Sequence, residues 1–223
     1  MPLDYLALKH GTDKASTAHG FAEIYERELP APDTVSTERP LRILEIGVES
    51  GASLRMWRDW YTAENGARRA AVIGVDSNPA CLGCKEEGID VILADASDAA
   101  FAEALGSASG PFDVVVDDGS HKCQDQVASF RALWPYVRAG GVYVVEDLHA
   151  SYFPEYQVDL EAGVKEGVMD YLLKGLLDAV NGHGKDWAAL GVNPEHVPGS
   201  YEATIESVRF YRHVCFVWKR VDA

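Results

Sequence analysis

The sequence predicts an α/β protein with a doubly wound, mostly parallel seven-stranded sheet that ends in an antiparallel hairpin. From Leu41 onward, short β-branched runs alternate with helical patterns, which is typical of a parallel sheet covered on both faces. After the fifth run this alternation stops. Two closely joined β-rich runs, residues 203–211 and 213–220, then end the chain and predict the hairpin.

The five parallel strands are predicted from their β-branched composition and the helices from apolar residues at helical spacing. Glycines after the apolar patterns mark the expected helix ends. The strands are LRILEI (41–46), AAVIGVD (70–76), DVILAD (90–95), FDVVVDD (112–118) and VYVVED (142–147). The helical segments are residues 20–29, 53–66, 126–141 and 163–182. This layout resembles that of the Rossmann-like class I S-adenosylmethionine-dependent methyltransferases from about Leu41 to the end.

Length, composition and charge limit the classes of protein to which the chain can belong. A chain of 223 residues fits one domain, and 47% hydrophobic with 25% charged residues is an ordinary globular composition. The formal net charge of −15, with no local stripe of Lys and Arg, argues against binding to nucleic acid. No apolar run is long enough for a membrane span, and the first residues lack the pattern of a signal peptide. We expect a cytoplasmic protein.

Four cysteines are too few for disulfide bonds to stabilise a chain of this size, and this also fits a cytoplasmic location. Cys81 and Cys84 form a CxxC motif, which suits a redox-active pair or half of a zinc site. No second pair of ligands stands at zinc-finger spacing. We therefore interpret the motif as incidental and give it no part in the mechanism.

The first strand runs into EIGVESGAS, Glu45 to Ser53. A dinucleotide-binding loop needs a glycine where Glu49 stands, and a carboxylate there would repel a pyrophosphate. S-adenosylmethionine has no pyrophosphate, so Gly47 and Gly51 fit a loop close to a ribose and an amino-acid tail. The loop favours the methyl donor over NAD, although a tight turn without a ligand would also explain it.

Acidic residues close the second and third strands. Asp76 is placed to accept hydrogen bonds from ribose hydroxyls. Asp95 ends the third strand, where the related enzymes place groups that recognise adenine, and Ser97 either contacts the ligand or caps the next helix. The donor site is thus predicted to contain Glu45, Gly47, Gly51, Ser53, Asp76, Asp95, Ser97 and Asp117.

Two carboxylate pairs, Asp117–Asp118 and Glu146–Asp147, close the fourth and fifth strands. Adjacent side chains in a strand point to opposite faces, so both reach one point only where the strand is ending. Carboxylates that converge in a partly dry cleft repel one another, and a hard divalent cation relieves the repulsion. The pattern predicts a Mg²⁺ site. The alternative is that these acids cap helices or pair with Arg and Lys.

His121 lies three residues beyond Asp118. A lone histidine is more often a structural hydrogen-bond partner, but an imidazole beside a metal cluster is suited to remove a hydroxyl proton near neutral pH. We interpret His121 as the general base.

Several motifs together resemble a narrower group, the metal-dependent sugar O-methyltransferases of antibiotic biosynthesis, typified by the mycinamicin and macrocin enzymes. The pairing of DDGSH with EDLH is the most specific part. The motifs are HGTDK (10–14), HGF (19–21), LEIGVESGASLRMW (44–57), VDDGSH (116–121), VVEDLHASY (144–152) and SVRFYRHVCFVWKR (207–220). The resemblance implies that Asp118, Glu146 and Asp147 bind Mg²⁺ and that His121 acts as base. Some relatives carry an N-terminal extension, so the chain looks short beside them, and a homo-oligomer is possible.

The resemblance also implies an organisation for the chain as a single methyltransferase domain, 1–223. Residues 1–40 form an N-terminal cap, residues 41–147 the donor- and metal-binding core, residues 148–202 an acceptor-binding insert and residues 203–223 the hairpin.

The acceptor is a hydroxyl of a glycosylated small molecule, which attacks the sulfonium methyl in line. His149 and Tyr152 are placed to contact the acceptor, with His149 also a candidate second base, or to pack under the insert. Lys14 is assigned to the substrate side, where it pairs with a carboxylate of the donor or with Asp13.

Three rival functions remain open. A catechol-type or polyketide O-methyltransferase also uses a metal to activate its acceptor, which is a phenol. Such enzymes typically have Asp-Asn at the fifth strand and lack GTDK. A nicotinamide-dependent oxidoreductase is disfavoured by Glu49 and by the absence of a suitably placed Tyr-x-x-x-Lys pair. A catalytically silent module that binds the donor is the third. The sequence does not say which sugar or hydroxyl is methylated.

Overall fold

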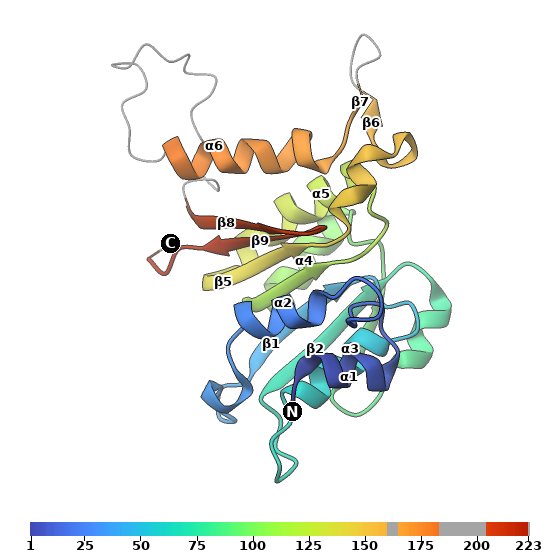
Figure 1. The fold of residues 1–223 in the computed structure, drawn as a ribbon, viewed down its shortest axis with the longest axis vertical. Coiled ribbons are helices and arrows are strands. Elements are labelled where there is room, and N and C mark those ends of the chain that lie inside the picture. Colours follow the sequence, from blue (N-terminus) through green and yellow to red (C-terminus); the bar gives the residue numbers. More distant parts are fainter. Residues whose placement is uncertain (160–164, 183–203, 223) are drawn as a thin grey trace.

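The computed structural model describes residues 1–159, 165–182 and 204–222. Within these ranges one sheet of seven strands has the order β3-β2-β1-β4-β5-β9-β8 (Figure 1). Strands β1 to β5 are parallel, whereas β9 runs antiparallel to both β5 and β8, so the predicted fold class is confirmed. The strands are β1 Leu41–Ile46, β2 Ala70–Asp76, β3 Ile89–Leu93, β4 Phe112–Asp117, β5 Val137–Val145, β8 Ile205–Tyr211 and β9 Val214–Lys219, and a separate two-stranded ribbon pairs β6 Val158–Asp159 with β7 Lys165–Glu166.

Helices cover both faces of this sheet. In Figure 1, α1 and α2 lie in front of it with α3, whereas α4 and α5 lie behind it. The α-helices are α1 Leu3–His10, α2 Phe21–Glu28, α3 Ala52–Trp60, α4 Ala99–Ser109, α5 Cys123–Leu133 and α6 Lys174–Gly182. Short turns of 3₁₀-helix are η1 Pro32–Thr34, η2 Pro79–Cys84, η3 Trp134–Tyr136, η4 Leu148–Tyr152 and η5 Pro154–Tyr156, and the π-helical turn η7 Met169–Leu173 precedes α6.

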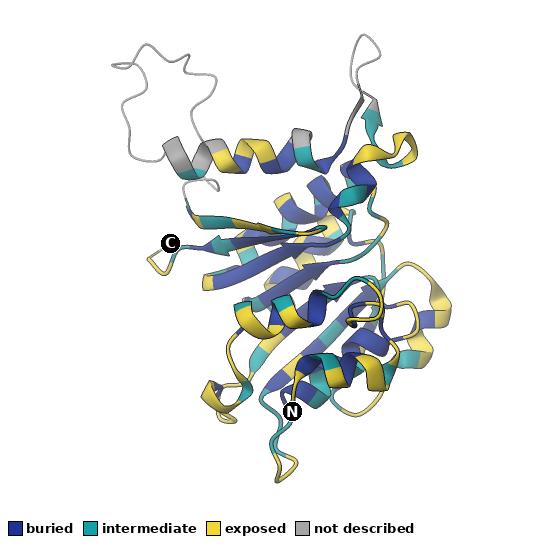
Figure 2. Ribbon diagram, in the orientation of Figure 1, coloured by how far each residue is buried: buried dark blue, intermediate teal, exposed yellow. Residues whose placement is uncertain are grey.

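Alternating residues of the strands divide the core into two layers. In β1, Ile43 packs in the layer beneath α1, α2 and α3, while Leu44 packs in the layer beneath α4 and α5. Both side chains are fully buried, and the strands of the sheet centre are buried along most of their length (Figure 2). This burial on both faces explains why the parallel strands read as nearly continuous apolar runs.

The helix before β5 is shorter than the sequence pattern predicts. The apolar periodicity predicts helix over residues 126–141, but α5 ends at Leu133 and β5 already begins at Val137. Pro135 has no backbone N–H to continue the helical hydrogen bonds, so the chain turns through η3 and enters the sheet. The strand also ends early, at Val145, which leaves Glu146 and Asp147 just beyond it.

The sequence pattern does not predict two of the helices, and of the two alternatives for Ser97 the structure excludes the helix cap. Helix α1 lies in the N-terminal region, where the pattern is weak, and α4 connects β3 to β4. The Asp98 side chain, not Ser97, caps α4 by accepting hydrogen bonds from the backbone N–H groups of Ala100 and Phe101. Ser97 instead bonds to Asp95.

Asp59 of α3 contacts two basic residues of α1 and so holds the two helices together. The Oδ2 atom of Asp59 lies 2.8 Å from both Lys9 Nζ and His10 Nε2. Burial opposes ionisation, but the hydrogen bonds from Lys9, Arg58 and His10 outweigh it and hold the pKa of Asp59 far below its usual value. The charged carboxylate therefore stabilises the folded state.

Asp59→Asn is expected to lower the free energy of unfolding by about 1–2 kcal/mol at pH 7, a value reduced for the partial exposure of the group. Because the folded pKa of Asp59 is lowered, its contribution is present above the unfolded pKa near 4 and is lost as pH falls. The difference between variant and wild type should therefore shrink at pH 3. Urea titrations at the two pH values measure it, and an equal difference at both would contradict the assignment.

Across the part of the chain that the structure describes, no helix combines the length and the apolar character needed to cross a membrane. The expected domain boundaries stay predictions, and much of the expected insert, residues 160–164 and 183–202, lies outside the described residues.

Candidate active site

A cavity of about 880 Å³ opens at the carboxyl ends of the parallel strands. This is where open α/β sheets bind ligands. Its walls come from the loop after β1, the ends of β2, β3, β4 and β5, and the turn that follows α1. Nine of the predicted site residues line it: Gly47, Ser53, Asp76, Asp95, Ser97, Asp117, Asp118, His121 and Asp147. Glu45, Gly51, Glu146, His149, Lys14 and Tyr152 are not among its lining residues.

The glycine loop closes tightly on the end of β4. Gly47 has a φ of +91°, and a Cβ atom at this position would lie 2.1 Å from the backbone oxygen of Asp118. Only glycine permits that approach, because any side chain would clash with backbone. Glu49, which stands where a dinucleotide fingerprint needs glycine, is exposed and has a φ of +49°.

Asp76 fixes this loop from the neighbouring strand. Its Oδ2 accepts hydrogen bonds from the backbone N–H of Val48 at 2.8 Å and of Glu49 at 3.3 Å. Burial alone would raise the pKa of Asp76, but these bonds and one from Asn78 lower it below the ordinary value. Asp76 is thus an ionised acceptor at the cavity wall, as an acid that receives ribose hydroxyls must be.

Two further acids lie along the same edge of the sheet, the exposed Asp95 after β3 and the buried Asp117 at the end of β4. Asp95 accepts hydrogen bonds from the Ser97 hydroxyl at 2.7 Å and from its backbone N–H at 2.9 Å, which lower the pKa of Asp95. Asp117 is buried, and Tyr143 Oη donates to its Oδ2 at 2.8 Å. Burial raises the pKa of Asp117 to about 6 in spite of this bond. The two acids therefore differ in how readily they hold a negative charge.

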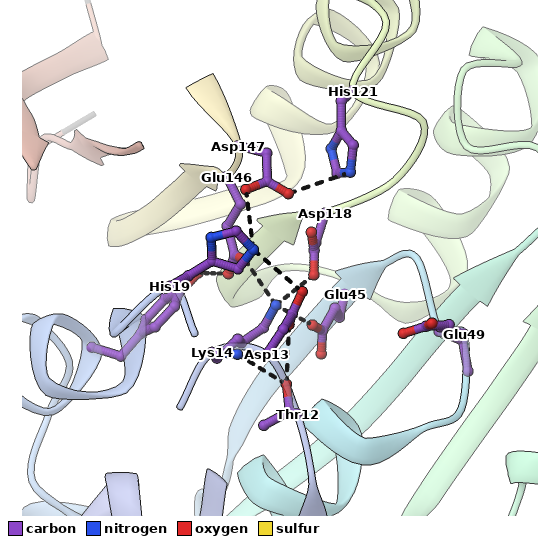
Figure 3. Close-up of polar contacts among 12 residues, drawn as sticks. Thr12, Asp13, Lys14, His19, Glu45, Glu49, Asp118, His121, Glu146 and Asp147 are labelled. Atoms are coloured by element: carbon purple, nitrogen blue, oxygen red, sulfur yellow. Dashed lines mark hydrogen bonds and ion pairs between the residues drawn. The ribbon is translucent and has the colours of Figure 1, made fainter. Parts of the chain in front are cut away.

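Asp118, His121 and Asp147 meet at the other end of the cavity. One candidate ligand atom from each lies within 4.8 Å of the others. His121 Nε2 is 3.4 Å from Asp147 Oδ2, and Figure 3 marks this contact between the two side chains with a dashed line. Asp147 Oδ1 is buried and accepts no hydrogen bond from the described residues. Two carboxylates and an imidazole whose ligand atoms lie this close together fit a cation site.

Backbone strain concentrates at this end of the molecule. Among the described residues, the non-glycine residues with positive φ are Glu49, His121, Asp147 and His213, and the first three line the cavity. His121 has a φ of +58° and Asp147 a φ of +53°. Such conformations cost of order 1–3 kcal/mol each and persist at functional sites because the surroundings enforce them. Here they turn both side chains toward one point.

Lys14 reaches this cluster from the turn between α1 and α2. The side chain is fully buried, and Nζ lies 2.5 Å from Asp118 Oδ2, 2.8 Å from Glu146 Oε2 and 3.4 Å from Glu45 Oε1. Burial lowers the pKa of the ammonium group, but these carboxylates outweigh burial and raise it well above the ordinary value. Lys14 is therefore charged and neutralises several acids, and Asp13, the protein partner considered for it, is not one of them.

Glu45 and Glu146 lie beneath the cavity wall and face Lys14. Trp57 Nε1 donates to Glu45 Oε2 at 2.9 Å, and Tyr25 Oη donates to Glu146 Oε1 at 2.5 Å. Burial raises the pKa of Glu45 to about 6, with Lys14 opposing the rise. Glu146 and Asp147 are adjacent in the chain but point apart, Glu146 to Lys14 and Asp147 to His121 (Figure 3).

The set of residues that meets at one point thus differs from the predicted ligand set. It contains Asp118 and Asp147 as expected, His121 in addition, and not Glu146. The ligand role of Glu146 stays a prediction.

His149 and Tyr152 lie on η4, outside the cavity lining. His149 Nδ1 is 3.7 Å from Asp147 Oδ1, and its ring contacts the ring of His213 at 4.7 Å between centroids. His121 and His149 thus flank opposite oxygens of one carboxylate. Tyr152 is 74% exposed, so its ring does not pack under other residues. Contact of either residue with an acceptor stays a prediction.

Sequence reasoning missed two residues of this region. Tyr25 is fully buried and holds Glu146, and His19 Nε2 lies 4.0 Å from Asp147 Oδ1. His19 belongs to the HGF motif that follows HGTDK, which was the available signal. Tyr25 lies on the apolar face of α2, where nothing in the pattern distinguishes it from an ordinary core aromatic.

Comparison with known proteins gives matches over the same elements. Residues 44–148 match a family described as a methyltransferase domain. The 8-demethyl-8-(2-methoxy-alpha-L-rhamnosyl)-tetracenomycin-C 3'-O-methyltransferase of Streptomyces olivaceus is 34% identical over 97% of the chain and 53% of its own length. The structure is also similar to that of MycE, a methyltransferase from the mycinamycin biosynthetic pathway, in complex with Mg and SAH. The TM-score is 0.81 at 31% identity, and the match covers 99% of this chain and 55% of MycE.

A further MycE structure, in complex with Mg, SAH and mycinamycin VI, has a TM-score of 0.79 at 31% identity and covers 99% of this chain and 54% of MycE. The chain spans about half the length of the curated relatives that it matches. The matches nevertheless cover 97% and 99% of this chain, and the range matched by the family model, residues 44–148, spans both carboxylate pairs and His121. The chain therefore matches a methyltransferase domain over residues 44–148 and resembles, along almost its whole length, sugar O-methyltransferases of natural-product pathways.

Proposed function

We propose that this protein is a Mg²⁺-dependent O-methyltransferase that transfers the methyl group of S-adenosylmethionine to a sugar hydroxyl of a glycosylated natural product. The observation that carries the proposal is the single cavity that joins the Asp76 and Asp95 end to the cluster of Asp118, His121 and Asp147. The relatives whose names specify methylated sugars support the acceptor class.

The donor end suits S-adenosylmethionine on chemical grounds. Asp76 is ionised and lies beside the glycine loop, where it can accept from both ribose hydroxyls. The exposed carboxylate of Glu49 at the loop opposes a pyrophosphate but not a sulfonium compound. Asp95 and Ser97 line the cavity at the next strand end, and we assign them to recognition of the base.

The acidic cluster has the donor set of a hard-cation site. Asp118 and Asp147 offer carboxylate oxygens, which Mg²⁺ prefers, and Glu146 is the third predicted ligand. His121 is better suited to proton transfer than to ligation here, because Mg²⁺ takes oxygen ligands whereas imidazole suits transition metals. Mg²⁺ bound in this site would supply Lewis-acid chemistry, lowering the pKa of an acceptor hydroxyl.

The residues of the chain then have distinct tasks. His121 accepts the hydroxyl proton, and Asp147, 3.4 Å from its Nε2, orients the ring and stabilises the imidazolium that forms. Lys14 neutralises Asp118, Glu146 and Glu45, so that these carboxylates do not repel one another when the site is assembled. In the overall reaction the acceptor oxygen bonds to the methyl carbon, the carbon–sulfur bond breaks, and S-adenosylhomocysteine leaves.

The protein is expected to be stabilised by S-adenosylhomocysteine and by Mg²⁺ but not by NAD. A ligand that binds only the folded state raises its stability by RT ln(1 + [L]/Kd), which is about 2.7 kcal/mol at a hundredfold excess over Kd. Thermal shift measurements with each ligand in turn give the result. A shift with NAD alone would replace this proposal with a nicotinamide-dependent oxidoreductase.

Activity is tested with a panel of rhamnosylated aromatic polyketides, macrolide glycosides and simple catechols, with product detected by mass. Methylation of a glycoside sugar, lost in excess chelator and restored by Mg²⁺, is the expected result. Methylation of the catechols alone would favour a phenolic O-methyltransferase. Binding of the donor without any transfer would favour a silent module, and size measurement in the same samples tests the predicted homo-oligomer.

A further inference from the structure

Cys81 and Cys84 occupy equivalent positions on one side of a short 3₁₀-helix. They stand three residues apart in η2, Pro79–Cys84, directly after β2. Residues i and i+3 of a 3₁₀-helix eclipse one another, and a rise of about 2 Å per residue places their Cα atoms about 6 Å apart. Disulfides span this separation without movement of the backbone. Both Sγ atoms also lie against one oxygen, the Glu49 carbonyl, at 3.4 Å and 3.8 Å.

This dithiol packs under the donor end of the cavity. The Cys81 thiol also hydrogen-bonds to Asp76, the acid assigned to the ribose, and Cys81 lines the cavity itself. Cys84 packs against Gly51, where a Cβ atom would lie 2.8 Å from the Cβ of Cys84. The two thiols therefore contact Glu49 and Gly51 of the glycine loop together with the carboxylate that fixes this loop.

We propose that Cys81 and Cys84 form a reversible disulfide that weakens binding of the methyl donor. The part concerning the donor rests on the function proposed above, whereas disulfide formation does not. In the dithiol form, Cys81 donates its thiol proton to Asp76 and Cys84 donates to the Glu49 carbonyl. In the disulfide form neither sulfur carries a proton, so these hydrogen bonds are lost. The glycine loop and Asp76, the acid assigned to the ribose, are then no longer held by the two thiols.

Cys84 is the thiol that reacts first. Burial and the nearby Asp76 carboxylate raise the pKa of the Cys81 thiol to about 11, and the thiolate is the reactive form. Cys84 is only partly buried, so a small oxidant reaches it from the surface. With hydrogen peroxide, the Cys84 thiol loses its proton, the thiolate attacks one oxygen and the O–O bond breaks. Cys84 becomes a sulfenic acid, and the departing hydroxide takes up the lost proton and leaves as water.

The second step closes the bridge. The Cys81 sulfur attacks the Cys84 sulfenic sulfur, the S–O bond breaks, and a second water leaves with the Cys81 proton. Two thiols are oxidised by two electrons in total, and one peroxide is reduced to two waters. An added dithiol reverses the reaction by thiol–disulfide exchange. The remaining cysteines, Cys123 and Cys215, are buried in the core and belong to other elements.

The test treats the protein with equimolar hydrogen peroxide, maps the cysteine peptides by mass spectrometry and measures the Kd for S-adenosylhomocysteine by calorimetry. A Cys81–Cys84 disulfide and a roughly tenfold weaker Kd, restored by dithiothreitol, are expected, since about 1.4 kcal/mol of lost contacts corresponds to a factor of ten. Failure to form this disulfide, or an oxidised protein with unchanged affinity, overturns the inference. If the reduced protein does not bind S-adenosylhomocysteine, the proposed function fails instead, and the peptide map still decides the dithiol chemistry.

Cys84→Ser supplies the matched control. The variant keeps a hydrogen-bond donor at position 84 but is unable to form the bridge, so the ratio of its Kd values before and after peroxide should be close to one. A loss of affinity equal to that of the wild type would place the oxidation elsewhere and overturn the inference.

Discussion

Replacing His121 with alanine is expected to lower kcat by at least about 10²-fold, the range that a general base contributes. The affinity for S-adenosylhomocysteine should change less than about threefold, because the lost group acts on the acceptor proton and not on the donor. Steady-state kinetics with the acceptor identified in the panel and calorimetry with the product give the two readings. The geometry behind the expectation is the 3.4 Å separation of His121 Nε2 and Asp147 Oδ2 at the cavity wall.

His149→Ala is the matched control, because His149 flanks the other oxygen of the same carboxylate at 3.7 Å but does not line the cavity. It should retain most of the activity. If His149→Ala loses activity and His121→Ala keeps it, the base is His149. Loss of donor affinity in His121→Ala would instead indicate that the residue supports the fold of the site.

Replacing Lys14 with methionine is expected to lower the free energy of unfolding at pH 7.5 by about 3–5 kcal/mol, as when one partner of a buried ion pair is removed. The ammonium group is fully buried against Asp118, Glu146 and Glu45, and methionine fills a similar volume without the charge. The loss arises because these carboxylates are left facing one another. Urea titrations of variant and wild type measure it.

The deficit of Lys14→Met should become smaller at pH 5.5. Burial already raises the pKa of Glu45 to about 6 with Lys14 present, and without the ammonium it rises further. An acid whose folded pKa is raised stabilises the fold at low pH and loses that contribution as pH rises through the folded pKa. The variant therefore recovers as its buried acids take up protons. A deficit independent of pH would point to lost packing alone.

Lys9→Met controls for the loss of a lysine as such. Lys9 pairs with Asp59 at 2.8 Å, but half of its side chain is exposed, and such pairs contribute about 1 kcal/mol or less. A loss for Lys14→Met as small as that for Lys9→Met would show that the buried acids are neutral without Lys14.

The strand order and the edge of the sheet that carries the site were predictable, because both follow from local patterns. Runs of β-branched residues, glycines that end helices and acidic residues at strand ends are all features of short segments. Parallel strands bring their carboxyl ends to one edge of the sheet whatever the details of packing. Asp76, Asp95 and Asp118 therefore line one cavity, as their places at strand ends imply. The end of α5 was less predictable, since Pro135 acts against an apolar periodicity that continues beyond it.

The sequence by itself determined that acids at successive strand ends come to one edge of the sheet, and only the tertiary structure decided which of them line the cavity and how their charges are matched. Glu146 and Asp147 are neighbours in the chain and alike in chemistry, yet Lys14 and Tyr25, more than a hundred positions away, direct one of them into the core. Asp147 turns instead toward His121. The physical reason is that a buried charge takes its environment from whatever packs against it, and that neighbour is set by the whole fold and not by the local sequence.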